Sequence, residues 1–154
     1  MNRNKKYIGP VIFIGFTITF FLTLIITKDK LIKHLDGINK PNKEESTRIL
    51  SDIFNDYNIQ EEDRDKIVFL EFGATTCASC KAMKNVLDEV KKRKSKEVLV
   101  IFMNLNQKKA QEYADNFNIN MIPTQILINK EGVEFFRHTG FIAYDELLIE
   151  FQKQ

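Results

Sequence analysis

The two cysteines of this 154-residue chain lie three positions apart, in the segment FLEFGATTCASC of residues 69–80. A nearly continuous apolar run, Ile67 to Phe72, precedes them, and a segment with apolar residues at helical spacing begins at Ala78. Such a run is typical of a strand that is buried on both faces. The sequence therefore predicts that Cys77 and Cys80 lie at the start of a helix that directly follows a buried strand.

The other predicted elements alternate between helix and strand, with no internal repeat. Ser46 is the predicted N-cap of the first helix, and the cysteine-bearing helix is expected to bury a stripe of Ala82, Val86, Leu87 and Val90. With 44% apolar and 29% charged residues, the composition fits one globular domain. The predicted order is α-β-α-β-α-β-β-α, over residues 47–57, 66–72, 78–93, 97–104, 106–116, 124–128, 133–138 and 144–152.

An uncharged apolar segment of 19 residues, Ile8 to Ile26, lies near the N-terminus. As a helix it would be roughly 28 Å long, close to the ~30 Å hydrocarbon core of a bilayer. A cleaved signal peptide usually has a shorter apolar region, about 7–15 residues, followed by small residues at the cleavage site, and a buried soluble helix is a third interpretation. We expect an uncleaved transmembrane anchor over 8–26, a tail over 1–7 and a linker over 27–45.

The charge distribution disfavours one class of partner and leaves the orientation of the anchor open. The formal net charge of +2 becomes −1 over residues 27–154, which gives little electrostatic reason to bind nucleic acid. Three cations precede the predicted anchor and five follow it within residues 28–43. By the positive-inside rule, this count alone mildly favours a cytoplasmic domain.

The predicted position of the cysteines favours redox chemistry. A helix N-terminus presents unpaired N–H groups and about half a positive charge, which stabilises a thiolate on Cys77. Cys80 lies one turn further along the same face, within bridging distance. One sulfur can therefore attack the disulfide of a partner, and the other can then resolve the mixed disulfide.

Three other uses of the cysteine pair are weaker interpretations. Structural zinc usually needs four ligands, and only His34 and His138 remain, without the spacing of a zinc site. A purely structural disulfide across so short a loop would constrain little of the unfolded chain. The third alternative is a pair of unreactive buried cysteines.

The segments FLEFGATTCASCK (69–81), MIPTQILINKEG (121–132) and HTGF (138–141) together resemble the thioredoxin family, over about residues 46–154. The resemblance implies the thioredoxin fold, an α/β fold with a central mixed sheet flanked by helices, here behind a single N-terminal transmembrane helix. It implies that Cys77 is the nucleophile and Cys80 the resolving thiol. A redox-active disulfide between them would then serve without any cofactor or metal.

The same resemblance assigns residues that would bind a client protein. Pro123 corresponds to the family's cis-proline, which faces the cysteine pair, and a cis X-Pro bond is rare enough to be a retained feature. Ile122 would offer its backbone to an extended client segment, and Thr124 completes the Ile-Pro-Thr motif. Gly140 matches the glycine that lets the client approach closely.

Glu71 interrupts the apolar run six residues before Cys77. A buried carboxyl in such a run is costly unless it is used, and burial raises its pKa toward neutrality. This suits it to accept the Cys80 proton when the mixed disulfide resolves, and the resemblance places it at the family's buried acid position. The alternative is a carboxyl that reaches the surface or pairs with a lysine.

The chain also departs from typical thioredoxins. Thr76 stands where they have tryptophan before the first cysteine, and Ala78 and Ser79 stand where they have glycine and proline. Phe102 occupies the position of a lysine near the buried acid, which leaves Glu71 without that partner. The redox potential of typical thioredoxins therefore does not carry over.

We expect a single-pass cell-membrane protein with a cytoplasmic N-terminus and an extracytoplasmic domain that reduces disulfides of client proteins and contributes to cell redox homeostasis. Similar anchored proteins in bacteria receive electrons from a membrane thiol carrier and reduce clients such as apocytochromes c. Ile122 before the proline, and the lack of histidine between the cysteines, favour a reductant. The alternatives are a disulfide-forming oxidase and a non-catalytic binding or chaperone module.

Overall fold

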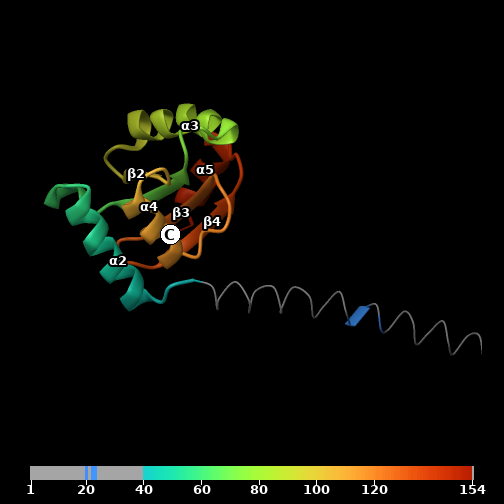
Figure 1. Cartoon of the computed structure of the whole chain (residues 1–154), viewed down its shortest axis with the longest axis horizontal. Helices are drawn as coiled ribbons and strands as arrows, with labels where there is room; N and C mark the ends of the chain where they lie inside the picture. The colour runs from blue at the N-terminus through green and yellow to red at the C-terminus, as the bar shows by residue number, and fades with distance from the viewer. Residues whose placement is uncertain (1–19, 21, 24–39, 154) are drawn as a thin grey trace, which may run out of the picture. The chain divides into compact units, whose positions relative to one another are not determined.

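The computed structural model describes residues 20, 22–23 and 40–153 of the chain. Residues 40–153 lie in a compact unit that spans Lys40–Gln154 and contains helices and a sheet (Figure 1). In chain order its elements are α2 (Lys43–Asp56), the 3₁₀ helix η2 (Glu61–Asp63), β1 (Ile67–Gly73), α3 (Ala78–Lys94), β2 (Val98–Asn104), α4 (Lys108–Asn116), β3 (Thr124–Ile128), β4 (Glu134–Thr139) and α5 (Tyr144–Phe151).

The four strands form one mixed sheet in the order β2-β1-β3-β4. β1 runs parallel to β2 and antiparallel to β3, and β3 runs antiparallel to β4. β1 is buried along its whole length, as its apolar sequence predicts. The expected mixed sheet flanked by helices is therefore confirmed.

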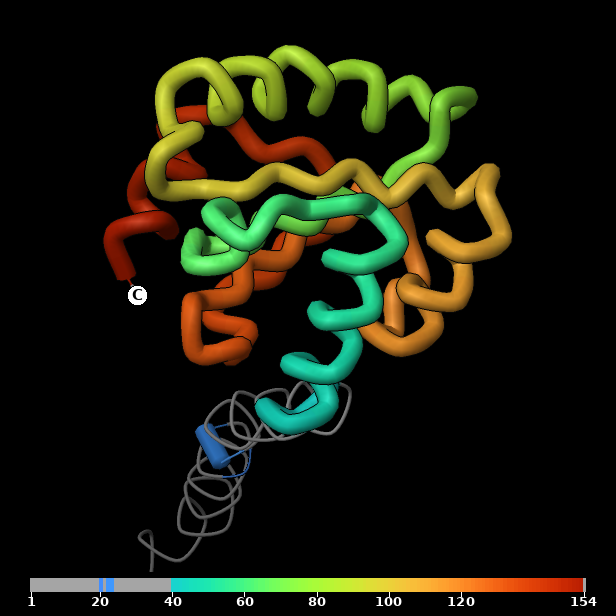
Figure 2. The backbone as a smooth tube through the Cα atoms, turned by 90° about the vertical axis from the view of Figure 1, so that its left-hand side faces the viewer, coloured from blue at the N-terminus to red at the C-terminus, as the bar shows by residue number. Residues whose placement is uncertain are grey.

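Helices cover both faces of the sheet. Figure 2 shows α3, in yellow-green, on the opposite side of the strands from α2, in blue-green. The side chains of β1 alternate between the faces because successive strand residues point to opposite sides. Leu70 and Phe72 pack on the side of α2 and α4, while Ile67 and Phe69 pack on the side of α3 and α5.

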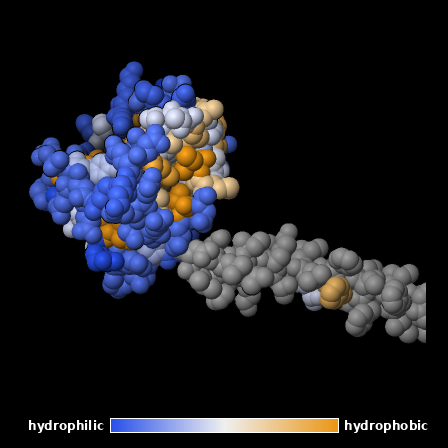
Figure 3. Space-filling view, in the orientation of Figure 1, coloured by the Kyte–Doolittle hydropathy of each residue, from blue (hydrophilic) through white to orange (hydrophobic). Residues whose placement is uncertain are grey.

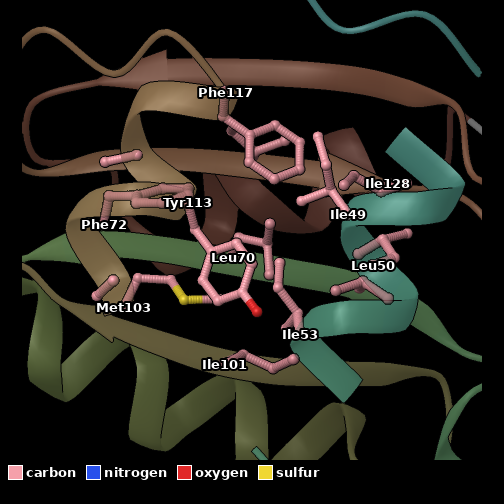
Figure 4. Close-up of a cluster of buried hydrophobic side chains, with 14 of the residues drawn as sticks. Ile49, Leu50, Ile53, Leu70, Phe72, Ile101, Met103, Tyr113, Phe117 and Ile128 are labelled. Carbon is pink, nitrogen blue, oxygen red and sulfur yellow. The ribbon is translucent and has the colours of Figure 1, made fainter. Parts of the chain in front are cut away.

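The larger core lies between α2, α4 and the sheet. Figure 4 shows Ile49, Leu50 and Ile53 of α2 pointing toward Leu70 and Ile101 of the strands. These α2 residues are at most 5% exposed, and their spacing of one turn is the pattern that predicts this helix. The helix is thus held by one apolar stripe, as expected from the sequence.

Local details of three elements differ from expectation. α2 begins four residues earlier than predicted, because the side chain of Asn42 caps it by accepting from the Glu45 N–H at 2.9 Å. Ser46 is a buried residue within the helix rather than its cap. In α3 the buried stripe uses Met83 in place of the exposed Ala82, since the helix turns its Met83 side to the sheet.

The third difference is strand β2, whose apolar sequence predicts a second buried strand over 97–104 but which forms one edge of the sheet. Only Val98, Ile101 and Met103 of its seven residues are buried. An edge strand has a neighbour on one side alone, so its remaining side chains stay partly exposed.

Within the described part of the chain, no helix combines the length and the apolar character needed to cross a bilayer. The predicted anchor over 8–26 and the tail over 1–7 fall outside the described residues, apart from positions 20, 22 and 23. So does the linker up to residue 39. These assignments stay predictions.

Candidate thiol–disulfide site

The cysteine pair lies where β1 passes through a short loop into α3. Cys77 is the N-cap residue of α3, and its Sγ accepts a hydrogen bond from the Cys80 backbone N–H at 3.2 Å. The two residues form a disulfide with Cα atoms 5.2 Å apart. Cys77 is partly exposed, whereas Cys80 is only 6% exposed. The outer sulfur is therefore the one that a partner can reach.

The surroundings of the Cys77 sulfur favour its negatively charged form. The free N–H groups and the positive dipole end of α3 point toward it, and the first turn contains no acidic residue. The Ser79 hydroxyl lies 3.2 Å from Cys77 Sγ and can donate to a thiolate there. Sequence reasoning gave Ser79 no role, although a serine two positions after an N-cap can reach back to it.

The predicted client-binding residues surround the start of β3. The Ile122–Pro123 peptide bond is cis, and Pro123 is buried. Thr124 Oγ1 donates to the Met121 carbonyl at 2.8 Å. The Gly140 N–H donates to the Pro123 carbonyl at 2.8 Å, which joins the two loops at this end of the sheet.

Strand register brings these loops to the same end of the sheet as the cysteines. Phe72 pairs with Thr124, and Thr124 pairs with Thr139. The cysteine loop follows Gly73, Pro123 comes just before Thr124, and Gly140 comes just after Thr139. The structure thus places the cysteine loop and all the predicted client-binding residues around one end of the sheet.

Glu71 lies two residues before Gly73, the last residue of β1. Its side chain is completely buried, at 0% exposure. Neither carboxyl oxygen has a hydrogen-bond partner among the described residues. Its register neighbours are Phe102 on β2 and Gln125 on β3. Burial raises the pKa of Glu71 to about 8, and the nearby Gln125 amide lowers it only in part, without forming a well-aligned hydrogen bond.

Gly73 leaves room between Glu71 and the resolving cysteine. A Cβ atom at Gly73 would lie 3.4 Å from Cys80 Sγ and 3.0 Å from the Phe102 ring. Because side chains two apart on a strand share a face, Glu71 lies on the same face as this position. The sheet beneath Cys80 therefore presents a bare backbone and then a carboxyl group, an arrangement suited to proton transfer.

Two further polar residues share the face of Glu71 and were missed from the sequence. Gln125 is 0% exposed, and its Nε2 donates to the Gly140 carbonyl at 3.1 Å. His138 pairs with Gln125 in register, and its Nε2 lies 3.2 Å from the Phe141 carbonyl. A glutamine within the apolar strand Thr124–Ile128 was the only local signal, and its alignment with Glu71 needs the strand register.

Apolar surface surrounds the site. Figure 3 shows such surface gathered on the side of the domain where α3 begins, while most of the remaining face in view is hydrophilic. Met121 is 66% exposed and Phe141 is 52% exposed, and these residues flank the loops that carry Pro123 and Gly140. Exposed large apolar residues beside a reactive group favour contact with another protein.

Among the described residues, no group of three metal-ligating side chains lies close enough together to hold a metal ion. One of the two histidines that were considered for zinc, His34, lies outside those residues. The disulfide between Cys77 and Cys80 is the reactive group that the structure contains.

Comparisons with known proteins agree with this geometry. The family model Thioredoxin matches residues 48–152. The thioredoxin of Echinococcus granulosus is 33% identical over 76 residues, which are 49% of this chain and 67% of that protein. The thioredoxin of Listeria monocytogenes is 26% identical over 92 residues, which are 60% of this chain and 86% of that protein.

Solved structures show the same fold. The germline-specific thioredoxin Deadhead of Drosophila melanogaster superposes with a TM-score of 0.56 at 20% identity, over 66% of this chain and 94% of that one. The exposed lipoprotein thioredoxin Etrx1 of Streptococcus pneumoniae gives a TM-score of 0.50 at 22% identity, over 60% and 87%. With the family model covering more than half of the sequence and a cysteine pair at the start of α3, the chain belongs to the thioredoxin family of thiol–disulfide oxidoreductases.

Proposed function

We propose that this protein is a membrane-anchored reductase that reduces disulfides of extracytoplasmic client proteins through Cys77 and Cys80. The observation that carries the proposal is the cysteine pair itself. A partly exposed Cys77 caps α3, and a buried Cys80 lies behind it within disulfide distance. This geometry gives one thiol for attack and a second for release.

The reaction proceeds in two exchanges. The Cys77 thiolate attacks a client disulfide, forms a mixed disulfide and releases one client thiolate. Cys80 then transfers its proton to the Glu71 carboxylate, and its sulfur attacks Cys77 Sγ. The second client thiolate leaves, and the protein is left with the Cys77–Cys80 disulfide.

The client is held at the edge formed by the two loops. Backbone groups of Ile122, beside Pro123 and Thr124, pair with an extended client segment, and Gly140 lets that segment approach. Met121 and Phe141, which are both more than half exposed, contact apolar client side chains. The client disulfide is thereby presented to Cys77.

The anchor is proposed from the uncharged segment 8–26. The domain joins the preceding chain at Lys40, whose ammonium group pairs with Glu134 at 3.2 Å. Glu134 begins β4, and Gly140 follows the end of the same strand. Lys40, the first residue of the described domain, therefore lies at the end of β4 that is remote from Gly140.

Two points support an extracytoplasmic position and a reducing direction. The similar fold in S. pneumoniae belongs to a protein described as an exposed lipoprotein, and adventitious disulfides form outside the cytoplasm. No charged residue stands between the cysteines, so the thiolate has only the helix dipole and the Ser79 hydroxyl to stabilise it, and the reduced form is less stabilised than in strong oxidases. A membrane thiol carrier would restore the reduced state.

Trapping experiments test the exchange. Cys80→Ser should accumulate mixed disulfides with clients, because the resolving thiol is gone, whereas Cys77→Ser should not. Glu71→Gln should slow resolution more than the first attack. Trapping through Cys80 alone, or equal trapping by both variants, would disprove the assignment of the nucleophile.

The reduction potential tests the direction of electron flow. We expect a value nearer the roughly −270 mV of thioredoxin than the roughly −120 mV of a strong oxidase. A value above about −180 mV, the range of the isomerases, would favour the oxidase. A protein that exchanges no disulfide would instead be a binding module.

A membrane-impermeant thiol reagent applied to intact cells tests the orientation of the domain. It should label reduced Cys77, and labelling only after lysis would place the domain in the cytoplasm.

A further inference from the structure

Gln125 is a fully buried polar residue to which the exchange reaction described above gives no role. Its Nε2 donates to the Gly140 carbonyl at 3.1 Å, but its Oε1 has no partner among the described residues. A buried polar atom without a partner is destabilising, because it has lost its hydrogen bond to water. An unpaired amide oxygen in the middle of β3 therefore calls for an explanation.

The strand register places this unpaired oxygen of Gln125 beside the carboxyl group of Glu71, whose oxygens are also unpaired within the described residues. Glu71 is the Cα partner of Gln125 across the β1–β3 pair, and cross-strand partners have Cβ atoms about 5 Å apart. Both Glu71 carboxyl oxygens are also without a partner among the described residues. Two neighbouring groups that can only accept would repel each other, but one proton on Glu71 turns the pair into a donor and an acceptor.

We propose that Gln125 is a positioning residue: its Oε1 accepts a hydrogen bond from protonated Glu71 while its Nε2 holds the Gly140 carbonyl, so that the proton beneath Cys80 is coupled to the client-binding loop. The proposal deepens the proposed function and rests on it. It requires no group beyond this chain, and it pairs two of the three unpartnered atoms, Gln125 Oε1 and one Glu71 oxygen, with each other.

The Glu71 proton is coupled to Gly140 because Oε1 and Nε2 belong to the same Gln125 amide. When Glu71 is protonated, Oε1 is satisfied and Nε2 is free to hold Gly140, whose N–H in turn binds the Pro123 carbonyl. When Glu71 is ionised, its carboxylate can only accept, so it repels Oε1 and draws the amide Nε2 away from the Gly140 carbonyl. Loss of the Glu71 proton thus loosens the loop that touches the client.

Few other ionisable groups face Glu71 from the elements packed around it. β2 contributes Phe102, which carries no charge, and β4 contributes His138, next to Gln125 in register. On α3 the group above Gly73 is Cys80, while Lys84 lies on the exposed side and pairs with Asp88. Tyr144 of α5 belongs to the core on this face. His138 is therefore the group whose charge must be controlled for.

The test is a pH titration of the full-length oxidised chain in detergent micelles, followed by carbon NMR from about pH 6 to about pH 10. We expect the Gln125 side-chain carbonyl and the Gly140 backbone carbonyl to shift with the same midpoint as Glu71. In Glu71→Gln neither should respond. A Gln125 resonance in the wild type that does not follow Glu71 would disprove the proposal.

The same titration of the variant Gln125→Leu is the second part of the test. Leucine is similar in size and removes an unpaired buried oxygen, so the variant should fold. The Gly140 carbonyl resonance should then lose most of its response to the ionisation of Glu71. The resonances of Phe102, the register neighbour of Glu71 on β2, should still respond. A Gly140 response that persists in Gln125→Leu, or that disappears in the control His138→Asn, would overturn the coupling.

A reduction assay on a model protein disulfide separates the two claims. If the wild type reduces the disulfide and Gly140 does not follow Glu71, the coupling is wrong and the proposed function stands. If the wild type reduces no disulfide, the proposed function fails, and Gln125 has no role in exchange whatever the titration shows.

Discussion

Glu71 is the residue at which stability and chemistry conflict. Its carboxyl group is completely buried between Phe102 and Gln125, and none of the described cations lies beside it. Taking an unpaired charge out of water is expensive, so the folded protein favours the neutral acid. Because its pKa is about 8, the ionised fraction of Glu71 is a base strong enough to take up the proton that Cys80 gives up.

The stability of the protein should therefore depend on pH through Glu71. The folded state retains a proton that the unfolded chain releases near pH 4.5, so the free energy of unfolding should fall as the pH rises from about 4.5 to about 8. The full difference corresponds to on the order of 5 kcal/mol. Glu71→Gln should remove this dependence and be more stable than the wild type at pH values above about 8.

Urea unfolding of the oxidised protein at a series of pH values measures this effect. Asp88→Asn is the matched control, because Asp88 is an exposed carboxyl paired with Lys84. Its stability difference from the wild type should be flat over the same range. A difference for Glu71→Gln that is equally flat would show that Glu71 is not buried as the neutral acid.

At the scale of elements, the β3–β4 hairpin is fitted against α2. The turn contains Gly132 at φ +78, a conformation that other residues rarely adopt. A Cβ atom there would lie 2.4 Å from Thr47 Oγ1. The Asn129 side chain closes the turn by accepting from the Val133 N–H at 2.9 Å. A side chain at residue 132 would therefore force the Thr47 side chain to move.

Gly132→Ala should lower the free energy of unfolding by about 1–3 kcal/mol, since it adds a clash to backbone strain. Adding Thr47→Ala should restore part of the loss, because the nearest atom is then gone. Gly140→Ala is the control: its φ is +104, but the nearest atom to the new Cβ is 3.9 Å away. Denaturant unfolding of the four proteins tests the interpretation, which fails if Thr47→Ala recovers nothing.

At the scale of the whole molecule, one buried carboxylate connects segments far apart in the sequence. The Glu134 side chain is 3% exposed and pairs with Lys40 at 3.2 Å and with Arg137 at 2.6 Å. Arg137 also donates to the Phe117 carbonyl at the end of α4, at 2.8 Å. These contacts join Lys40, β4 and α4, so we expect the folding unit to begin at Lys40 rather than within α2.

Fragments with different start points test this boundary. A fragment that begins at Lys40 should keep the Asn42 cap and the pair with Glu134, whereas one that begins at Ser46 loses both. The shorter fragment should be less stable by about 1–2 kcal/mol, mainly through the lost cap. Thermal and urea unfolding measure the difference, and equal stability would place the boundary at the first buried turn of α2.

Most of the elements, and the position of the reactive pair, could be predicted from the sequence. The apolar run from Ile67 to Phe72 has the length of a buried strand, and the apolar residues of α2 recur at one-turn spacing. These signals are local, because they depend on how a short segment divides its side chains between core and solvent. The same holds for Cys77 and Cys80, whose position at the start of a helix follows from the local order of strand, loop and helix.

Only the tertiary structure decided which distant residues meet. Asn42 and Ser46 are both acceptable caps, and packing of Ser46 against the domain selects Asn42. The edge position of β2, the row of Glu71, Gln125 and His138, and the tie from Gln125 to Gly140 all depend on strand register. Register pairs residues more than 50 positions apart, as for Glu71 and Gln125, and no local pattern encodes that pairing.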